Sequence, residues 1–137
     1  MDKALSYMAL ARKAGRIELG EEPAGAAAQA RKASLIVVAG DASDHTWRRA
    51  KSFVAGTDQP CIRLEFTKDQ LGQAIGRTSL ALAAFTDPAL ALAFVKALSP
   101  AHTEVQAVLE QAQAKRKTPQ NKGFRSKKQG RSRPAAK

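Results

Sequence analysis

The sequence predicts an α/β sandwich in which a small, mostly buried sheet has helices on both faces. Segments with a helical spacing of apolar residues alternate with short apolar runs that are typical of strands. One of these runs, Leu35 to Ala39, is continuously aliphatic, as in a central strand that is covered on both faces. A chain of 137 residues is long enough for one domain with an appendage. Alternating elements around such a strand imply a sheet between helical layers.

The elements before this central strand are predicted by their spacing and their end signals. In order, they are a helix, a short strand and a second helix, at residues 3–14, 16–19 and 21–31. Gly15 supplies the expected end of the first helix. The second helix is predicted from its alanine content, because alanine is the strongest helix former. Pro23 is compatible with that helix because it falls within the first turn.

The elements after the central strand are predicted by caps and periodicity. They are a helix, a strand, a short helix, a strand and two further helices, at residues 43–55, 61–66, 68–75, 80–85, 88–98 and about 100–115. Asp41 and Ser43 are helix-start residues, and we expect Asp41 to cap a helix. Thr67 with Gln70 forms a capping box, and Asp87 before a proline marks another start. The last helix has an apolar stripe that we expect to dock on the domain; binding a partner is the alternative.

The C-terminal part of the chain differs from the rest in its charge. Of the 23 Lys and Arg residues, ten lie in residues 115–137, which contain no Asp or Glu, whereas residues 1–114 have 13 basic and 12 acidic side chains. Such a tail repels itself and has too few apolar groups to fold, so we expect it to be disordered. Its natural partner is nucleic acid, because neutralised phosphates release counterions. The expected phosphate contacts are Lys115, Arg116, Lys117, Lys122, Arg125, Lys127, Lys128, Arg131 and Arg133.

Several other partners and chemistries are disfavoured by composition. A merely solubilising tail does not need such one-sided charge, and Phe124 alone is a weak membrane anchor. No run approaches the ~20 apolar residues of a membrane span, and the start of the chain lacks a secretory signal, so we expect a cytoplasmic protein without a membrane partner. Cys61 is the only cysteine and is expected to be a buried small hydrophobe. With two histidines, no cluster has metal-ligand spacing.

The sequence predicts no catalytic residue. It has no glycine-rich phosphate loop with a lysine, and the VVAGDAS stretch lacks the paired glycines of a dinucleotide-binding turn. Glu21 and Glu22 are adjacent, so on a helix they point about 100° apart and do not converge on one substrate. We therefore expect a protein that is not an enzyme, with no cofactor and no metal.

Three stretches of the chain are specific when they are taken together. They are ALARKAGRIELGEE, ASLIVVAGDAS and QPCIRLEFTKDQLGQAIGRTSLALAAFTD. The most specific residues within them are Gly20 with the acids that follow it, the strand end at Ala39, Gly40 and Asp41, and an LG-x-A-x-G element of Leu71, Gly72, Ala74 and Gly76. In residues and spacing, roughly positions 3–98 resemble the kink-turn-binding ribosomal-protein family of the L-seven-Ae and L-thirty-e type, especially its bacterial ribosomal-protein-like branch.

The resemblance implies a three-layer α/β/α domain with a mixed four-stranded sheet at residues 1–98, followed by an extra helix at 99–114 and the basic tail at 115–137. Family members clamp a sharply bent RNA whose kink is flanked by sheared G·A pairs. They place the start of the second helix against those pairs and use the loop before the last strand to hold an extruded nucleotide. By position, the implied RNA-binding residues are Gly20, Glu21, Glu22, Ser43, Trp47, Arg77, Thr78 and Ser79.

The start of the second helix departs from the family pattern. Pro23 stands where the family has an acid, and Ala26 stands where it has a lysine. A missing lysine–phosphate contact lowers affinity and flattens the salt dependence by about 0.9 per contact. Glu22 can accept hydrogen bonds from guanine. Glu21 and Glu22 together also repel phosphate, and they are equally explained as first-turn residues that stabilise the helix dipole.

The basic and aromatic candidates also have alternatives. Trp47 is either a stacking platform for an unpaired base or a core aromatic residue on the buried stripe of its helix. Arg77 suits RNA contact because a guanidinium pairs with phosphate and stacks on bases. Lys13 and Arg16 are predicted near the same end as further phosphate contacts, with solvated surface residues as the alternative.

The sequence therefore predicts a cytoplasmic RNA-binding protein that is a monomer and not an enzyme. The folded domain is expected to recognise kink-turn-like structured RNA, with ribosomal RNA as a candidate, while the tail adds non-specific phosphate contacts. Ribosomal or ribosome-assembly proteins are further candidate partners. The alternative is a protein-interaction domain whose RNA site has decayed, with nucleic acid bound by the tail alone.

Overall fold

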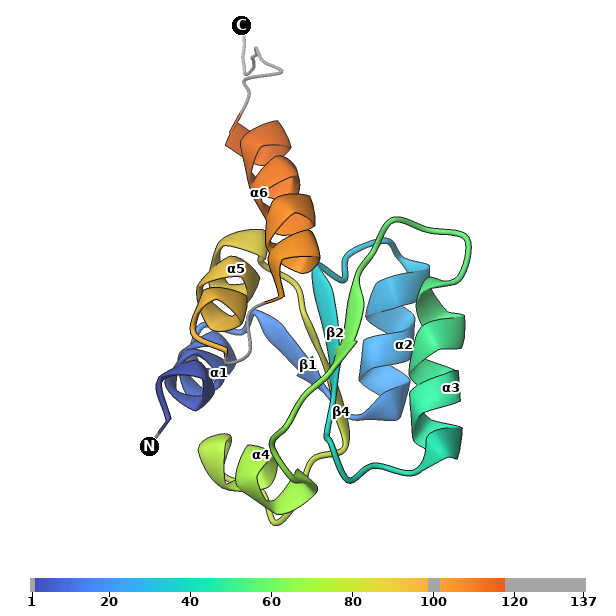
Figure 1. Cartoon of the computed structure of the whole chain (residues 1–137), viewed down its shortest axis with the longest axis vertical. Coiled ribbons are helices and arrows are strands. Elements are labelled where there is room, and N and C mark those ends of the chain that lie inside the picture. Colours follow the sequence, from blue (N-terminus) through green and yellow to red (C-terminus); the bar gives the residue numbers. More distant parts are fainter. Residues whose placement is uncertain (1, 99–101, 118–137) are drawn as a thin grey trace, which may run out of the picture.

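The computed structural model describes residues 2–98 and 102–117, and it has three layers (Figure 1). Helices α2 and α3 cover one face of a four-stranded sheet, and α1 and α5 cover the other. Helix α4 lies at one end of the sheet and α6 at the opposite end. The helices are α1 (Lys3–Lys13), α2 (Glu21–Gln29), α3 (Asp44–Val54), α4 (Lys68–Ala74), α5 (Pro88–Lys96) and α6 (Thr103–Lys117). The predicted α/β/α sandwich is confirmed.

The sheet is mixed, as expected, with the strand order β1-β4-β2-β3. Its strands are β1 (Ile17–Leu19), β2 (Leu35–Val38), β3 (Cys61–Arg63) and β4 (Leu82–Phe85). Strand β4 runs antiparallel to β1 and β2, whereas β3 runs parallel to β2. The C-terminal ends of β1, β2 and β3 therefore lie at the same end of the sheet as the N-terminal end of β4.

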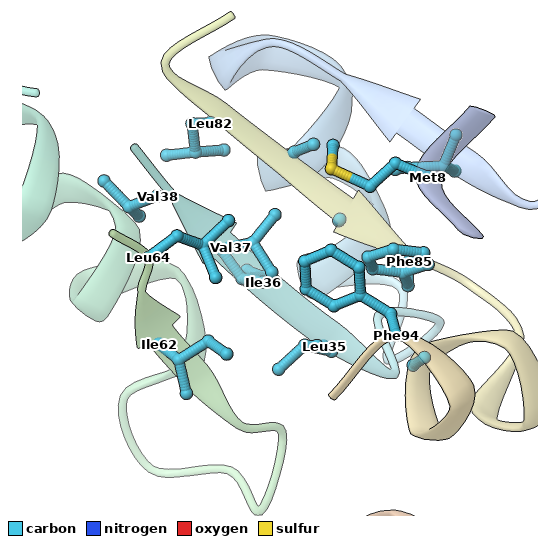
Figure 2. Close-up of a cluster of buried hydrophobic side chains, with 14 of the residues drawn as sticks. Met8, Leu35, Ile36, Val37, Val38, Ile62, Leu64, Leu82, Phe85 and Phe94 are labelled. Atoms are coloured by element: carbon cyan, nitrogen blue, oxygen red, sulfur yellow. The ribbon is translucent and has the colours of Figure 1, made fainter. Parts of the chain in front are cut away.

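The core lies on both sides of the two interior strands. Every residue of β2 and β4 is buried, which explains why both segments are uninterrupted apolar runs. Figure 2 shows Phe85 of β4 beside Phe94 of α5, with Met8 of α1 nearby. The two phenyl rings are tilted by 40°, with their centroids 5.0 Å apart. Such pairs add to the stability that burial alone gives.

The helix caps follow the prediction in most places, but one acts at a distance. Thr67 and Gln70 form the expected capping box of α4. The Ser43 side chain accepts the Thr46 N–H at the start of α3. The Asp41 side chain caps α4 rather than the adjacent α3, because its carboxylate accepts the Lys68 N–H at 2.8 Å. This bond fixes the loop after β2 against the start of α4.

Two boundaries differ from the sequence prediction. The strand predicted at residues 61–66 ends at Arg63, because the chain then crosses Gly40. A Cβ at Gly40 would lie 2.5 Å from the Leu64 carbonyl oxygen, so only glycine allows this crossing. The helix predicted to end at Arg31 ends two residues earlier, at Gln29, and Arg31 adopts a left-handed conformation with φ 59°.

The C-terminal helix docks on the domain and is longer than expected. Leu109 is fully buried in the core, and Val105 packs against it. Helix α6 continues to Lys117, so the backbone of residues 115–117 is helical and not part of a disordered tail. Alanine, lysine and arginine all favour helix, which explains the extension. The other predicted tail contacts, Lys122, Arg125, Lys127, Lys128, Arg131 and Arg133, lie outside the described residues.

Two further features concern membranes and thiol chemistry. No helix within residues 2–98 and 102–117 is long and apolar enough to cross a membrane. In the same part of the chain, no three His, Cys, Asp or Glu side chains are grouped closely enough to hold a metal ion. Cys61 is half-buried rather than fully buried. Burial raises the pKa of its thiol to about 11, against the opposing effect of Lys51, so the thiol stays protonated at neutral pH.

Candidate nucleic-acid interface

The topology brings the predicted contact segments to one end of the sheet. Leu19, at the end of β1, pairs with Ala83 near the start of β4, and Val38, at the end of β2, pairs with Leu82. Helices α2 and α3 therefore start at this end, and the loop from α4 to β4 returns to it (Figure 1). We call this end the predicted RNA face. It consists of Gly20, Glu21, Glu22, Ser43, Trp47, Arg77, Thr78 and Ser79.

The start of α2 presents free backbone donors. Gly20 is the N-cap with φ 99°, a conformation that favours glycine, and no side chain in the described part of the chain caps the helix. Its own N–H donates to the Leu82 carbonyl at 2.9 Å, which ties α2 to β4. The first N–H groups of a helix lack intrahelical partners, so together with the helix dipole they favour an acceptor or an anion. Pro23 lacks an N–H, which removes one of these donors.

The two glutamates at this helix start have different surroundings. Glu21 forms an ion pair with Arg49 of α3, from carboxylate Oε1 to guanidinium Nε. Glu22 is exposed and has no hydrogen bond or ion pair from its side chain within residues 2–98 and 102–117. Glu21 therefore links α2 to α3, whereas the Glu22 carboxylate is available to accept hydrogen bonds from a ligand.

An open groove of about 460 Å³ runs between α2 and α3. A Cβ at Gly25 would lie 3.0 Å from the Phe53 ring, so glycine lets this ring approach α2 closely. The Arg49 guanidinium lies 5.5 Å from the centroid of the same ring. Ala26 also lines the groove. The groove therefore holds an arginine of α3, paired with Glu21, beside the position where the family pattern has a lysine on α2.

Trp47 makes cation–π contacts and also packs against the core. Its side chain is half-buried and packs against the core cluster. Lys51 Nζ lies 5.4 Å and Arg63 Cζ 5.7 Å from its ring centroid. Arg63 also donates to the Ala42 carbonyl at 2.5 Å, which fixes the guanidinium. Cation–π contact with these side chains competes with base stacking at Trp47, so the packing role is the one that the geometry favours.

The loop between α4 and β4 is held in place by two glycines. Helix α4 ends in a Schellman motif, in which the Arg77 N–H donates to the Gly72 carbonyl at 2.8 Å and the Gly76 N–H to that of Gln73. Gly76 has φ 74°, as this motif requires. A Cβ at Gly72 would lie 2.6 Å from the backbone of Ser79. The LG-x-A-x-G element thus allows the loop to pack directly on α4.

The side chains of this loop are available for contact. Arg77, Thr78 and Ser79 are all exposed. Beside them lies Arg12, which the sequence does not predict, with its guanidinium 3.2 Å from the position that a Cβ at Gly76 would take. No local pattern indicates this contact, since it depends on how α1 packs beside α4.

The expectation that Arg16 lies at the same end of the molecule as Arg77 is wrong. The residue after Arg16, Ile17, pairs with Phe85, the last residue of β4, so Arg16 lies at the opposite end of the sheet from Arg77. The error arises from the topology. Because β1 runs antiparallel to β4, the start of β1 lies beside the end of β4 and not beside the loop that precedes β4.

A comparison with curated proteins places this architecture in a family. Over 75 residues the chain is 35% identical to the RNA-binding protein YlxQ of Enterococcus faecium, and the match spans 55% of this chain and 72% of that protein. The chain belongs to the YlxQ family. This family is a bacterial branch of the L-seven-Ae type, so the predicted relationship is confirmed at that level. No known family profile matches the sequence.

Solved structures share the fold of this YlxQ-family chain. A Bacillus halodurans protein of unknown function is 22% identical, has a TM-score of 0.63, and is matched over 80% of this chain and 99% of its own. The 15.5kD RNA binding protein of Giardia lamblia is 18% identical, with a TM-score of 0.61, over 77% of this chain and 87% of its own. These similarities establish the α/β/α fold.

Proposed function

We propose that this protein binds structured RNA and that the predicted RNA face recognises a kink-turn. Two relatives in sequence or fold, from Enterococcus faecium and Giardia lamblia, are named as RNA-binding proteins. The observation that carries the proposal is the juxtaposition of an uncapped helix start at Gly20 with a rigid, exposed loop at Arg77 to Ser79. The Gly20 N–H is bonded to Leu82, the first residue of β4, and the loop leads into the same strand.

Each part of the predicted RNA face has a role in this proposal. The free N–H groups of α2 and the unpaired Glu22 carboxylate face the edges of the G·A pairs. The carboxylate accepts hydrogen bonds from guanine N–H groups, and the helix N–H groups donate to acceptor atoms of the bases. The loop of Arg77 to Ser79 holds the extruded nucleotide, with the guanidinium on a phosphate or a base. Arg49 of α3, which is paired with Glu21, is the cation that lines the groove beside Ala26.

In this proposal the chain acts as a cytoplasmic monomer whose tail strengthens RNA binding independently of the RNA sequence. A tethered basic segment acts at high effective concentration once the folded domain is bound. Phosphate contacts from such a segment are independent of sequence and weaken steeply with salt.

The proposal is tested by equilibrium binding across a salt series. The RNAs are a kink-turn hairpin and the same hairpin with its G·A pairs replaced, and the proteins are the full chain and residues 1–117. The shorter protein retains α6, because Leu109 belongs to the core. We expect both proteins to prefer the intact kink-turn, and the shorter one to have a smaller salt slope.

One specific observation favours an alternative function. The Glu21–Arg49 ion pair spans the groove between α2 and α3, which is what an interaction surface without RNA would retain. If the full chain binds both hairpins equally and residues 1–117 bind neither, the tail is the RNA-binding element and the folded domain serves a protein partner.

A further inference from the structure

A basic cavity lies at the end of the sheet opposite the predicted RNA face. It has a volume of about 670 Å³ and is walled on one side by α6. Its lining includes three exposed cations, Arg16, Arg31 and Lys32, against one acid, Asp58. We name it the basic cavity. The polar residues Ser34, Gln59, Thr86 and Gln111 also line it.

Backbone hydrogen bonds fix the segments that surround this cavity. The Thr86 N–H donates to the Arg16 carbonyl at 2.9 Å, and the Ser34 N–H donates to the Phe85 carbonyl at 2.7 Å. The Ala33 N–H donates to the side chain of Gln59 at 3.1 Å. These bonds tie the segments that line the cavity to one another and to the last residue of β4.

The conformation of Arg31 is the most informative feature of this cavity. Helix α2 ends in a Schellman motif, with the Lys32 N–H bonded to the Ala27 carbonyl and the Arg31 N–H to that of Ala28. This places Arg31 at the left-handed position, with φ 59°, where glycine is usual. Among the described residues, every other positive-φ position is a glycine. An arginine at a strained position indicates that its side chain is needed there.

The three cations have no partner within the described part of the chain. In residues 2–98 and 102–117, the side chains of Arg16, Arg31 and Lys32 make no hydrogen bond and no ion pair, and neither does that of Asp58. The C-terminal residues 118–137 contain no acid, so this segment of the chain is electrostatically unsuited to the cavity. Three unpaired cations among hydroxyl and amide groups suit the phosphates of a polyanion.

We propose that the basic cavity is a second RNA-contact site, which binds backbone phosphates of nucleotides other than those at the predicted RNA face. The strands between the two ends are three or four residues long, or about 13 Å at the usual rise per residue, so one phosphate cannot touch both. Helix α6 lines the cavity and continues to Lys117, so the first residues of the basic segment lie at this end of the sheet. The cavity and tail therefore bind the same RNA arm. The identity of the polyanion rests on the proposed function.

The test uses the full chain, with Arg31→Gly alone and combined with Arg16→Ala and Lys32→Ala. Lys96→Ala is the matched control, since Lys96 is exposed on α5 and does not line the cavity. The combined variant should weaken binding to both hairpins alike and reduce the salt slope by about 0.9 for each phosphate contact that it removes. Arg31→Gly alone should lower affinity yet melt no lower than the parent chain, because glycine suits the left-handed position.

The outcomes separate this inference from the proposed function. If the cavity variants bind as Lys96→Ala does while the parent still prefers the kink-turn, the inference is overturned and the proposed function stands. If the parent shows no preference but the cavity variants have a smaller salt slope, the inference stands and kink-turn recognition fails.

Poly-glutamate of matched charge is the second probe at the same ionic strength. Tighter binding of that acidic chain than of RNA, abolished in the combined variant, would overturn RNA as the occupant.

Discussion

The two ends of the sheet hold their charges in different ways. At the predicted RNA face, Arg49 is paired with Glu21, and Arg63 is fixed by the Ala42 carbonyl. At the basic cavity, the cations are exposed and have no partner in the described part of the chain. Arg77 is also exposed, but it lies on a loop that α4 holds in place, and groups in fixed positions suit recognition of shape, whereas unpaired cations suit sequence-independent attraction. We therefore infer that specificity and affinity come from opposite ends of the molecule.

The largest effect is expected from removing the wall of the basic cavity. Leu109→Ala truncates a fully buried side chain of α6 and should lower the free energy of unfolding by about 2 to 5 kcal/mol. Val108→Ala is the control, because Val108 lines the same cavity but is 39% exposed. Thermal or urea unfolding measures both. Equal, small losses would show that α6 is not part of the core.

A substitution at Gly72 should break the predicted RNA face. A Cβ there would meet the backbone of Ser79 at 2.6 Å, so Gly72→Ala must displace the loop. We expect a loss of stability of about 1 to 3 kcal/mol, as for other overpacked sites. Replacing glycine by alanine within a helix usually raises stability, so the expected loss at Gly72 is opposite in sign to the usual effect. Gln73→Ala, at an exposed position of the same helix, should be nearly neutral; a stabilised Gly72→Ala would contradict the close approach.

Arg77→Ala tests recognition without disturbing the fold. If the guanidinium makes a specific contact, binding to the kink-turn hairpin should weaken by about 1 to 3 kcal/mol, while binding to a plain duplex stays nearly unchanged. Titration of both RNAs with the full chain measures this. Equal losses on the two RNAs would remove Arg77 from the recognition site.

Ala26→Lys should have a small effect, which reports whether the groove between α2 and α3 faces RNA. A lysine at this groove position adds one phosphate contact, so the salt slope should increase by about 0.9. Ser6→Lys, on the exposed face of α1, is the control for added charge. No change relative to that control at low salt would mean that the groove between α2 and α3 does not face RNA.

Local patterns in the sequence predict most of the fold. The buried runs of β2 and β4, the capping box at Thr67 and the glycine stops are signals within a few residues, and the structure contains them. The bond from Asp41 to the start of α4 joins residues 27 apart, so a local pattern assigns this cap to α3. Long-range packing, not propensity, decides such contacts.

The candidate site could be predicted in part. The family resemblance indicates the residues that the topology brings together at the predicted RNA face. The basic cavity could not be predicted, because Arg16 and Arg31 come to the same cavity only through the pairing of β1 and β2 with β4. The left-handed Arg31 occurs without the glycine that usually marks such a helix end, so the sequence pattern extends the helix to it.

One measurement shows whether the two ends of the molecule make different contributions to RNA binding. It is the ratio of affinities for the intact kink-turn hairpin and for the hairpin with replaced G·A pairs, compared among the full-length parent, Arg77→Ala and Arg31→Gly. Arg77→Ala should lower this ratio, whereas Arg31→Gly should weaken both affinities and leave the ratio unchanged. A ratio that falls with Arg31→Gly and stays constant with Arg77→Ala would contradict this expectation.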